Sequence, residues 1–72
     1  MDPAKLVHMA NQIARNLATA GDSAPAAIAE HIRLFWDPRM IAQIREQARD
    51  SGAGLEPLAA AALELLEKGD AS

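Results

Sequence analysis

Hydrophobic residues recur every three or four positions in four separate stretches of the chain, a spacing that predicts amphipathic helices. The predicted helices cover about residues 3–20, 24–36, 38–50 and 56–68. No stretch combines strict alternation with the β-branched residues typical of strands. The pattern therefore predicts an all-α fold, a small bundle of about four short helices that forms a single helical domain over residues 1–72.

Local signals mark where these helices begin and end. Asp2-Pro3 and Asp37-Pro38 are both start signals, because an Asp side chain can cap a helix and Pro suits its first position. Asp22 or Ser23 is the expected cap of the second helix, and the glycines at 21, 52, 54 and 69 are expected at helix ends and turns. The connections between the helices are thus expected to be short.

The junction between the second and third predicted helices holds the chain's single Phe and single Trp, Phe35 and Trp36. An aromatic side chain can bury roughly 150–250 Å², so we expect Phe35, Trp36, Asp37 and Pro38 to form the structural hub. The expected core residues share inward-facing helical positions and are Ile13, Leu17, Ile28, Ile32, Phe35, Trp36, Ile41, Ile44, Leu58 and Leu65. In the last helix Leu63 falls at the margin of this stripe.

Two outward faces each allow two interpretations. On the first helix, the face opposite the stripe carries few charges and contains Val7, Asn11, Ala14 and Ala18, with His8 and Arg15 beside it. Alanine is a good helix former, but small residues also let another chain approach closely. On the third helix, Arg45 and Arg49 are either a solvated face or a pair that awaits a partner's carboxylates.

Composition narrows the function classes. The chain has 72 residues, half of them hydrophobic, and no cysteine that could form a disulfide or a thiolate metal site. A domain of this size buries only about 60% of its unfolded surface, so dependence on a partner is expected. The net charge of −3 is spread unevenly, with a local +2 over residues 31–49 and a local −4 from residue 50 onward. This mild charge asymmetry is not typical of a nucleic-acid-binding protein.

The chain shows no targeting or membrane segment. No basic region precedes a long apolar run near Met1, and no apolar run approaches the ~18 residues that suggest a membrane span. We expect a cytoplasmic protein.

Candidate chemistry is sparse. No nucleophile has a base near it in sequence, and His8 and His31 form no recognised metal-binding spacing. We expect no catalytic, cofactor-binding or metal-binding residue in this chain, and His31 is expected to be a half-buried packing residue beside Phe35. The second and third helices could imitate a DNA-binding helix-turn-helix, but the acidic total and the few lysines argue against it.

Three stretches resemble a known family. They are K-L-V-H-M-A-N-Q-I at residues 5–13, H-I-R-L-F-W-D-P-R-M at residues 31–40, and G-A-G-L-E-P-L at residues 52–58. In this order and spacing they resemble the delta subunit of the NAD-dependent, molybdenum-containing formate dehydrogenases of bacteria. The F-W-x-P-R-M string is the most specific of the three.

The resemblance implies an accessory subunit that supports assembly or stability of a formate-oxidising complex. It implies that the cofactors lie in partner subunits: molybdopterin guanine dinucleotide and iron–sulfur clusters in the alpha subunit, FMN and the NAD site in the beta subunit, and a further cluster in the gamma subunit. The alternative is a generic helical interaction adaptor or a helix-turn-helix-like DNA-binding module. The isolated chain could also self-associate.

The resemblance also directs attention to two arginines. Arg33 and Arg39 flank the aromatic corner inside the family's most specific string, although packing of the rings does not require Arg there. An Arg fork suits recognition of carboxylates or carbonyls across an interface. We therefore hypothesise that Arg33 and Arg39 contact the catalytic subunit, with Asn11 and Leu34 as further docking candidates. The alternative is that both arginines pair with Glu30 or Asp37 within the chain.

Overall fold

All regular structure in the described residues is helical. The computed structural model describes residues 2–49 and 54–71, and its elements in chain order are α1 (Pro3–Leu17), the 3-10 helix η1 (Ala18–Ser23), α2 (Ala24–Phe35), α3 (Pro38–Ala48) and α4 (Pro57–Ala71). The predicted all-α fold is confirmed. The predicted number of about four helices is slightly off, because η1 is a further helical element where only a turn was expected.

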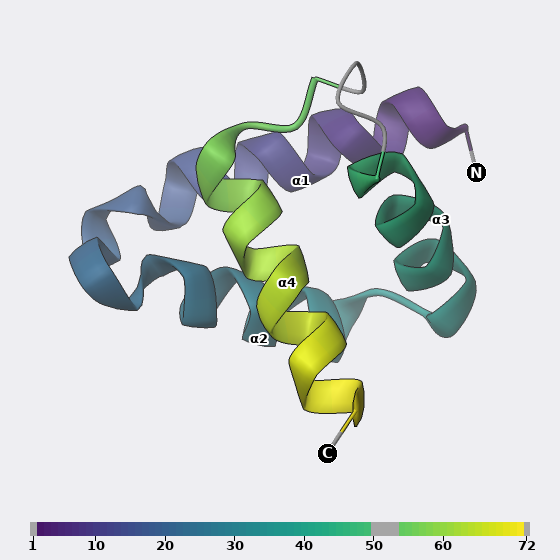
Figure 1. Cartoon of the computed structure of the whole chain (residues 1–72). Helices are drawn as coiled ribbons and strands as arrows, with labels where there is room; N and C mark the ends of the chain where they lie inside the picture. Colours follow the sequence, from purple (N-terminus) through teal and green to yellow (C-terminus); the bar gives the residue numbers. More distant parts are fainter. Residues whose placement is uncertain (1, 50–53, 72) are drawn as a thin grey trace.

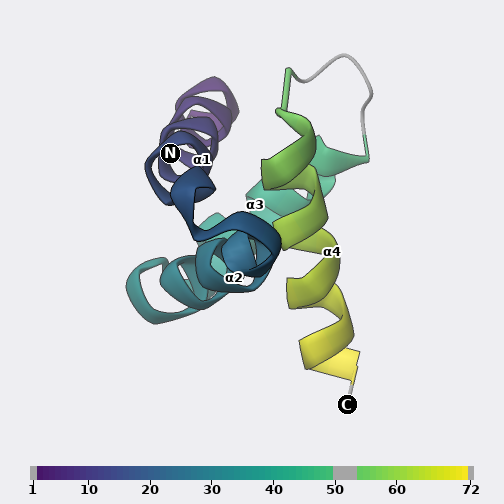
Figure 2. The same cartoon turned by 90° about the vertical axis from the view of Figure 1, so that its left-hand side faces the viewer.

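The four α-helices pack around a shared core. α1 and α2 run roughly antiparallel and are joined by η1, while α3 turns away from the end of α2 (Figure 1). α4 passes across α2, and the view turned by 90° shows α1 above α2 and α4 beside it (Figure 2). α2 makes its most extensive contacts with α4, and α1 contacts α2, α3 and α4. The Cα radius of gyration is 10.9 Å, close to the ~11 Å typical of a compact chain of this length.

Both predicted Asp caps are present. The backbone N–H of Ala4 donates to the Asp2 side chain across 3.0 Å, and that of Met40 donates to Asp37 across 2.9 Å. A proline follows each cap at the first helical position, where the missing N–H removes no helical hydrogen bond. These two helix starts therefore form as the local sequence predicts.

The other boundaries differ from the predictions in detail. α1 ends at Leu17 because the chain tightens into η1, in which Gly21 has φ 65° and ψ −130°, a conformation that favours glycine. Ser23 precedes α2, but its side chain makes no capping hydrogen bond. α4 continues to Ala71, past the predicted end at residue 68. The predicted end of the third helix at residue 50 and the glycine turn at residues 51–53 lie outside the described residues.

The core lies where the four α-helices meet. Its largest fully buried side chains are Leu6, Ile28, Ile32 and Ile44, and Trp36 is also buried. Four predicted core residues are only partly buried, but they pack against this cluster: Ile13, Leu17, Ile41 and Leu58.

Phe35 is a correction to the predicted core, because 72% of its surface is exposed. α2 ends at Phe35, and Trp36 adopts an extended backbone with φ −98° and ψ 141°. Successive side chains in an extended chain point to opposite sides, so the corner buries the indole of Trp36 and leaves the neighbouring ring outside. The hub is therefore Trp36 with its Asp37-Pro38 helix start.

Leu65 is a second correction, with 39% of its surface exposed. The buried stripe of α4 has the i, i+3, i+4, i+7 spacing of an amphipathic helix and consists of Ala59, Ala62, Leu63 and Leu66. Leu63, predicted at the margin, is only 2% exposed. α4 therefore turns a different face toward the core than the one predicted. Leucines lie on both sides of its hydrophobic stripe, so the sequence pattern does not decide which side is buried.

The predicted outward face of the first helix is a third correction. Val7 and Ala14 are buried, whereas His8 and Arg15 are exposed. α1 buries a broader face than its stripe suggested, because three other helices contact it. The small side chains do allow close approach of another segment, and in this structure that segment includes the chain's own residues 54–56.

Candidate functional site

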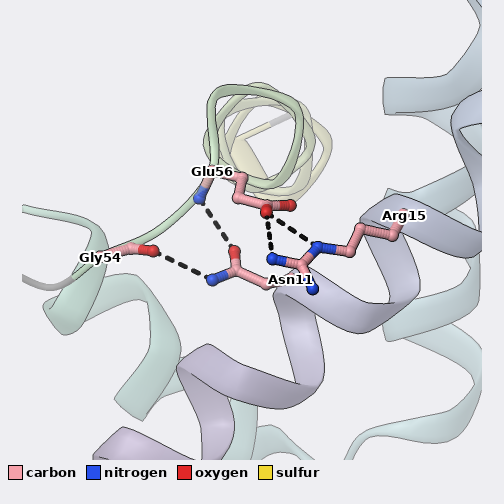
Figure 3. A network of polar contacts seen from close by, with 4 residues as sticks. All are labelled: Asn11, Arg15, Gly54 and Glu56. Carbon is pink, nitrogen blue, oxygen red and sulfur yellow. Dashed lines mark hydrogen bonds and ion pairs between the residues drawn. The ribbon is translucent and has the colours of Figure 1, made fainter.

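Asn11 joins α1 to the segment that leads into α4. Its side-chain Nδ2 donates to the carbonyl oxygen of Gly54 across 2.9 Å, and its Oδ1 accepts from the backbone N–H of Glu56 across 2.9 Å (Figure 3). The amide thus pairs with the backbone as a peptide group would. Only one orientation of the amide satisfies both contacts, since a carbonyl cannot donate and an N–H cannot accept.

Arg15 adds an ion pair one turn further along the same helix. Its Nε and Nη2 both approach Oε1 of Glu56, at 2.9 and 2.8 Å (Figure 3). The Arg15 side chain is 70% exposed, so solvent screening leaves this pair a small share of the stability. The four residues Asn11, Arg15, Gly54 and Glu56, called the Asn11 clamp below, therefore position α4.

The clamp is not predicted by the local sequence. Asn11 was noticed as a polar residue on a face of small side chains, but its partners are more than 40 residues away in sequence. The available signal was a polar amide between Val7 and Ala14 on a face that turned out to be buried. Such an amide needs a hydrogen-bond partner.

The α2–α3 corner exposes an apolar edge. Leu34 and Phe35 are 67% and 72% exposed, and the ring centroids of His31 and Phe35 lie 4.7 Å apart at an interplanar angle of 38°. His31 is half-buried against Phe35, which confirms its predicted packing position. Leu34 lies three positions after His31 and so neighbours it on the helix surface.

A groove of about 400 Å³ opens beside this edge. One wall comes from α1 and consists of Met9, Gln12, Ile13 and Asn16. The other wall comes from the end of α2 and the start of α3 and consists of His31, Phe35, Trp36 and Met40. We call these eight residues the corner groove. None of them is acidic, although the whole chain has a net charge of −3.

The predicted docking residues lie in different settings. Arg33 forms an ion pair with Glu30 one turn earlier on α2, which is the intramolecular alternative expected from the sequence. Arg39 is exposed and makes no ion pair or hydrogen bond through its side chain with the residues that the structure describes. Leu34 is exposed beside the corner groove, and Asn11 is engaged in the clamp. The structure brings Leu34 and Arg39 to the corner and directs Asn11 to α4.

A second depression, of about 280 Å³, lies between α3 and α4. Arg45 and Arg49 line it together with Glu64 and Glu67, and Arg45 donates through Nη2 to the carbonyl oxygen of Leu66 across 3.1 Å. The two arginines thus line the same depression as two carboxylates of their own chain. The hydrogen bond of Arg45 favours a role for this residue in holding α3 near α4.

No group of three or more His, Asp or Glu residues within residues 2–49 and 54–71 could hold a metal ion. The search of the same residues for helices long and apolar enough to cross a membrane also found none. These features define a small helical domain whose most distinctive surface is an apolar groove next to two exposed large hydrophobic side chains.

Comparison with known families identifies the class of protein. The family model described as NADH-dependant formate dehydrogenase delta subunit FdsD matches residues 5–63, so the chain belongs to this family. The resemblance seen in the sequence is thereby confirmed. No curated protein and no solved structure matches the chain.

Proposed function

We propose that the chain is a non-catalytic accessory subunit of an NAD-dependent formate dehydrogenase in the cytoplasm. It supports assembly or stability of the complex by docking on the larger subunits. The family match over residues 5–63 carries this proposal, because a subunit must associate with other subunits. The small core of the domain is consistent with a protein that is completed by partners.

We further propose that the redox cofactors lie in the partner subunits. Iron–sulfur clusters are held mainly by Cys thiolates, and this chain has no cysteine. We assign the molybdopterin guanine dinucleotide, the FMN and the NAD site to the partner subunits because the resemblance to the delta-subunit family implies this division. Formate oxidation to carbon dioxide with reduction of NAD would then take place outside this chain.

The alpha subunit, which would carry the catalytic site, is the proposed docking partner. Leu34 and Arg39 are the best presented of the docking candidates, because both are exposed at the α2–α3 corner. To bind a partner, Arg33 would have to share its guanidinium with Glu30. Asn11 would have to use the part of its side chain that the clamp hydrogen bonds do not occupy.

Co-purification from cells that produce the whole enzyme tests the function. A tag on the wild-type chain should recover the large subunits at a constant ratio, and deletion of the chain should lower the yield of assembled enzyme. Recovery of none of these subunits, together with normal assembly after deletion, would overturn the proposal. Recovery of DNA that is lost steeply with added salt would favour the helix-turn-helix alternative instead.

The docking residues are tested in the same preparation. A double Arg33→Ala, Arg39→Ala variant should fold normally and co-purify poorly, because its arginines are at the surface. Arg49→Ala is a matched control, since Arg49 is an exposed arginine at the other end of α3. Equal recovery of the wild-type chain and the double variant at moderate salt would remove both arginines from the docking surface.

A further inference from the structure

We propose that the corner groove binds an amphipathic segment of another formate dehydrogenase subunit, with apolar side chains inserted in the groove and carboxylates beside it. The inference rests on the proposed function and specifies which surface of the chain would dock and what chemistry its partner would present. It is carried by the groove's lining, by the two exposed hydrophobic side chains at its edge, and by the charges around it.

The lining provides an adaptable apolar surface. Met9, Ile13 and Met40 are half-buried, so each packs against the core on one side and borders the groove on the other. Methionine side chains are flexible and polarisable, which suits a surface that must fit the side chains of a partner. The groove volume of about 400 Å³ would admit more than one such side chain.

Phe35 lines the groove, and Leu34 next to it extends the exposed apolar surface beyond the groove. Both are more than 60% exposed, and neither belongs to the buried core. The folded chain alone therefore gains little from two large hydrophobic side chains at these positions. Exposed apolar surface that adjoins a groove is typical of a protein interaction site.

The polar groups in and around the groove indicate which polar side chains the partner segment would carry beside its apolar ones. Gln12, Asn16 and His31 line the groove and can donate hydrogen bonds. Lys5 lies one helical turn before Met9, and Arg39 directly precedes Met40. The amides and His31 can pair with donors or acceptors of a partner, and the two cationic side chains favour a partner segment that carries carboxylates.

The nearest acid does not change this charge pattern. Asp37 lies between Trp36 and Met40, but its carboxylate accepts a hydrogen bond from the Met40 N–H and stabilises the start of α3. A carboxylate at a helix N-terminus interacts favourably with the helix dipole. Within residues 2–49 and 54–71, Arg39 and Lys5 are charged side chains beside the groove residues Met40 and Met9 that form no ion pair.

The same charges disfavour a second copy of the chain as the occupant. A two-fold dimer through this surface would bring the same patch of both copies together. The basic groups of one corner would then approach those of the other, and like charges across an interface are unfavourable. An acidic, apolar segment of a different subunit has no such conflict.

Apolar docking is tested with the double variant Leu34→Ser, Phe35→Ser in the complete enzyme complex. Both side chains are largely exposed, so the melting temperature of the chain should stay near that of the wild type. Its affinity for the complex should fall about tenfold or more, as expected when exposed anchors of an interface are lost. Leu65→Ser is the control, because Leu65 is an exposed leucine on α4, a helix that contributes no residue to the groove.

These outcomes separate the inference from the proposed function. If the wild-type chain binds the complex and the double variant binds equally well, the corner groove is not the docking surface. If the wild-type chain does not bind the complex, the proposed function itself fails. A loss of binding in the double variant that Leu65→Ser shares to the same degree would also overturn the inference.

The acidic character of the partner is tested by charge reversal. Arg39→Glu should weaken binding markedly, whereas Arg49→Glu, on the distant end of the same helix, should leave it near the wild-type value. The wild-type affinity should also fall with added salt. Equal binding of the Arg39→Glu variant and the wild type would overturn the acidic partner segment.

A photo-crosslinking amino acid at position 35 tests the identity of the occupant. The expected adduct joins position 35 to an apolar segment with acidic neighbours in another formate dehydrogenase subunit. An adduct between two copies of this chain, or with a basic segment, would overturn the inference.

Discussion

The backbone N–H of Glu56 donates a hydrogen bond to Oδ1 of Asn11 across 2.9 Å, although 45 positions separate the two residues in sequence. The same amide donates to the carbonyl of Gly54. These contacts hold the entry to α4 against α1. Small neighbours on α1, including Ala10 and Ala14, leave room for this approach.

Asn11→Ala should destabilise the chain by about 1–3 kcal/mol, because the partly buried N–H of Glu56 loses its partner. Urea denaturation followed by circular dichroism measures the change. Asn16→Ala is the control, since Asn16 lies on the same helix but is exposed, and its replacement should be neutral or slightly stabilising. Equal effects of the two substitutions would contradict the clamp.

Trp36→Ala should destabilise the chain by about 3–5 kcal/mol, the usual range for truncation of a large buried aromatic side chain. That is a large fraction of the stability of a small domain, so the free chain should lose most of its helical signal. Phe35→Ala, next to it, should change the unfolding free energy by less than about 1 kcal/mol because its ring is already exposed. Unfolding curves of the two variants measure these free-energy changes. A larger loss of stability in Phe35→Ala than in Trp36→Ala would reverse the assignment of the hub.

Asp37→Ala should cost about 1 kcal/mol, the typical value of a helix N-cap. Asp37→Asn retains an oxygen that can accept from the Met40 N–H, so it should retain most of the stability. Thermal unfolding at neutral pH compares the two variants. A similar loss in both would indicate that the carboxylate acts through its charge and not through the cap.

The ion pair between Arg15 and Glu56 should contribute little. A double-mutant cycle with Arg15→Ala and Glu56→Ala is expected to give a coupling of about 0–1 kcal/mol that decreases with salt. Glu56→Ala leaves the backbone N–H to Asn11 in place, so the cycle isolates the side-chain pair. A coupling well above this range would show that the pair is more shielded from solvent than its exposure indicates.

The purified chain by itself should oxidise no formate, reduce no NAD and contain no stoichiometric molybdenum, iron or zinc. The physical reason is its lack of cysteine and of any described cluster of metal-ligating side chains. An activity assay with formate and NAD, together with elemental analysis, checks this. Formate oxidation without other subunits would refute the accessory role.

The helices that could be predicted well were those with local start signals. The caps at Asp2 and Asp37 depend on a side chain and backbone groups two or three residues away, so sequence alone indicated them. Likewise, Ile28, Ile32 and Ile44 followed the helical spacing into the core. The end of α1 was less predictable, because the chain tightens into a 3-10 helix before Gly21 reverses its direction.

The candidate site was only partly predictable. The aromatic corner, the half-buried His31 and the surface position of Leu34 followed from their places on the predicted helices. The corner groove did not, because its lining residues on α1 face residues at least 15 positions further along the chain. Ile13 was assigned to the core on its spacing, and the structure shows that it packs against the core and also lines the groove.

The sequence by itself determined that the chain is helical, where α1 and α3 begin, and which family it resembles. These properties depend on periodicity, capping and short motifs, all of which act over a few residues. Only the tertiary structure decided that Trp36 is buried while Phe35 is exposed, that Val7 and Ala14 face inward, and that Asn11 holds Gly54 and Glu56. Each of these outcomes depends on which distant segment covers a given helix face, and a short local pattern contains no information about that segment.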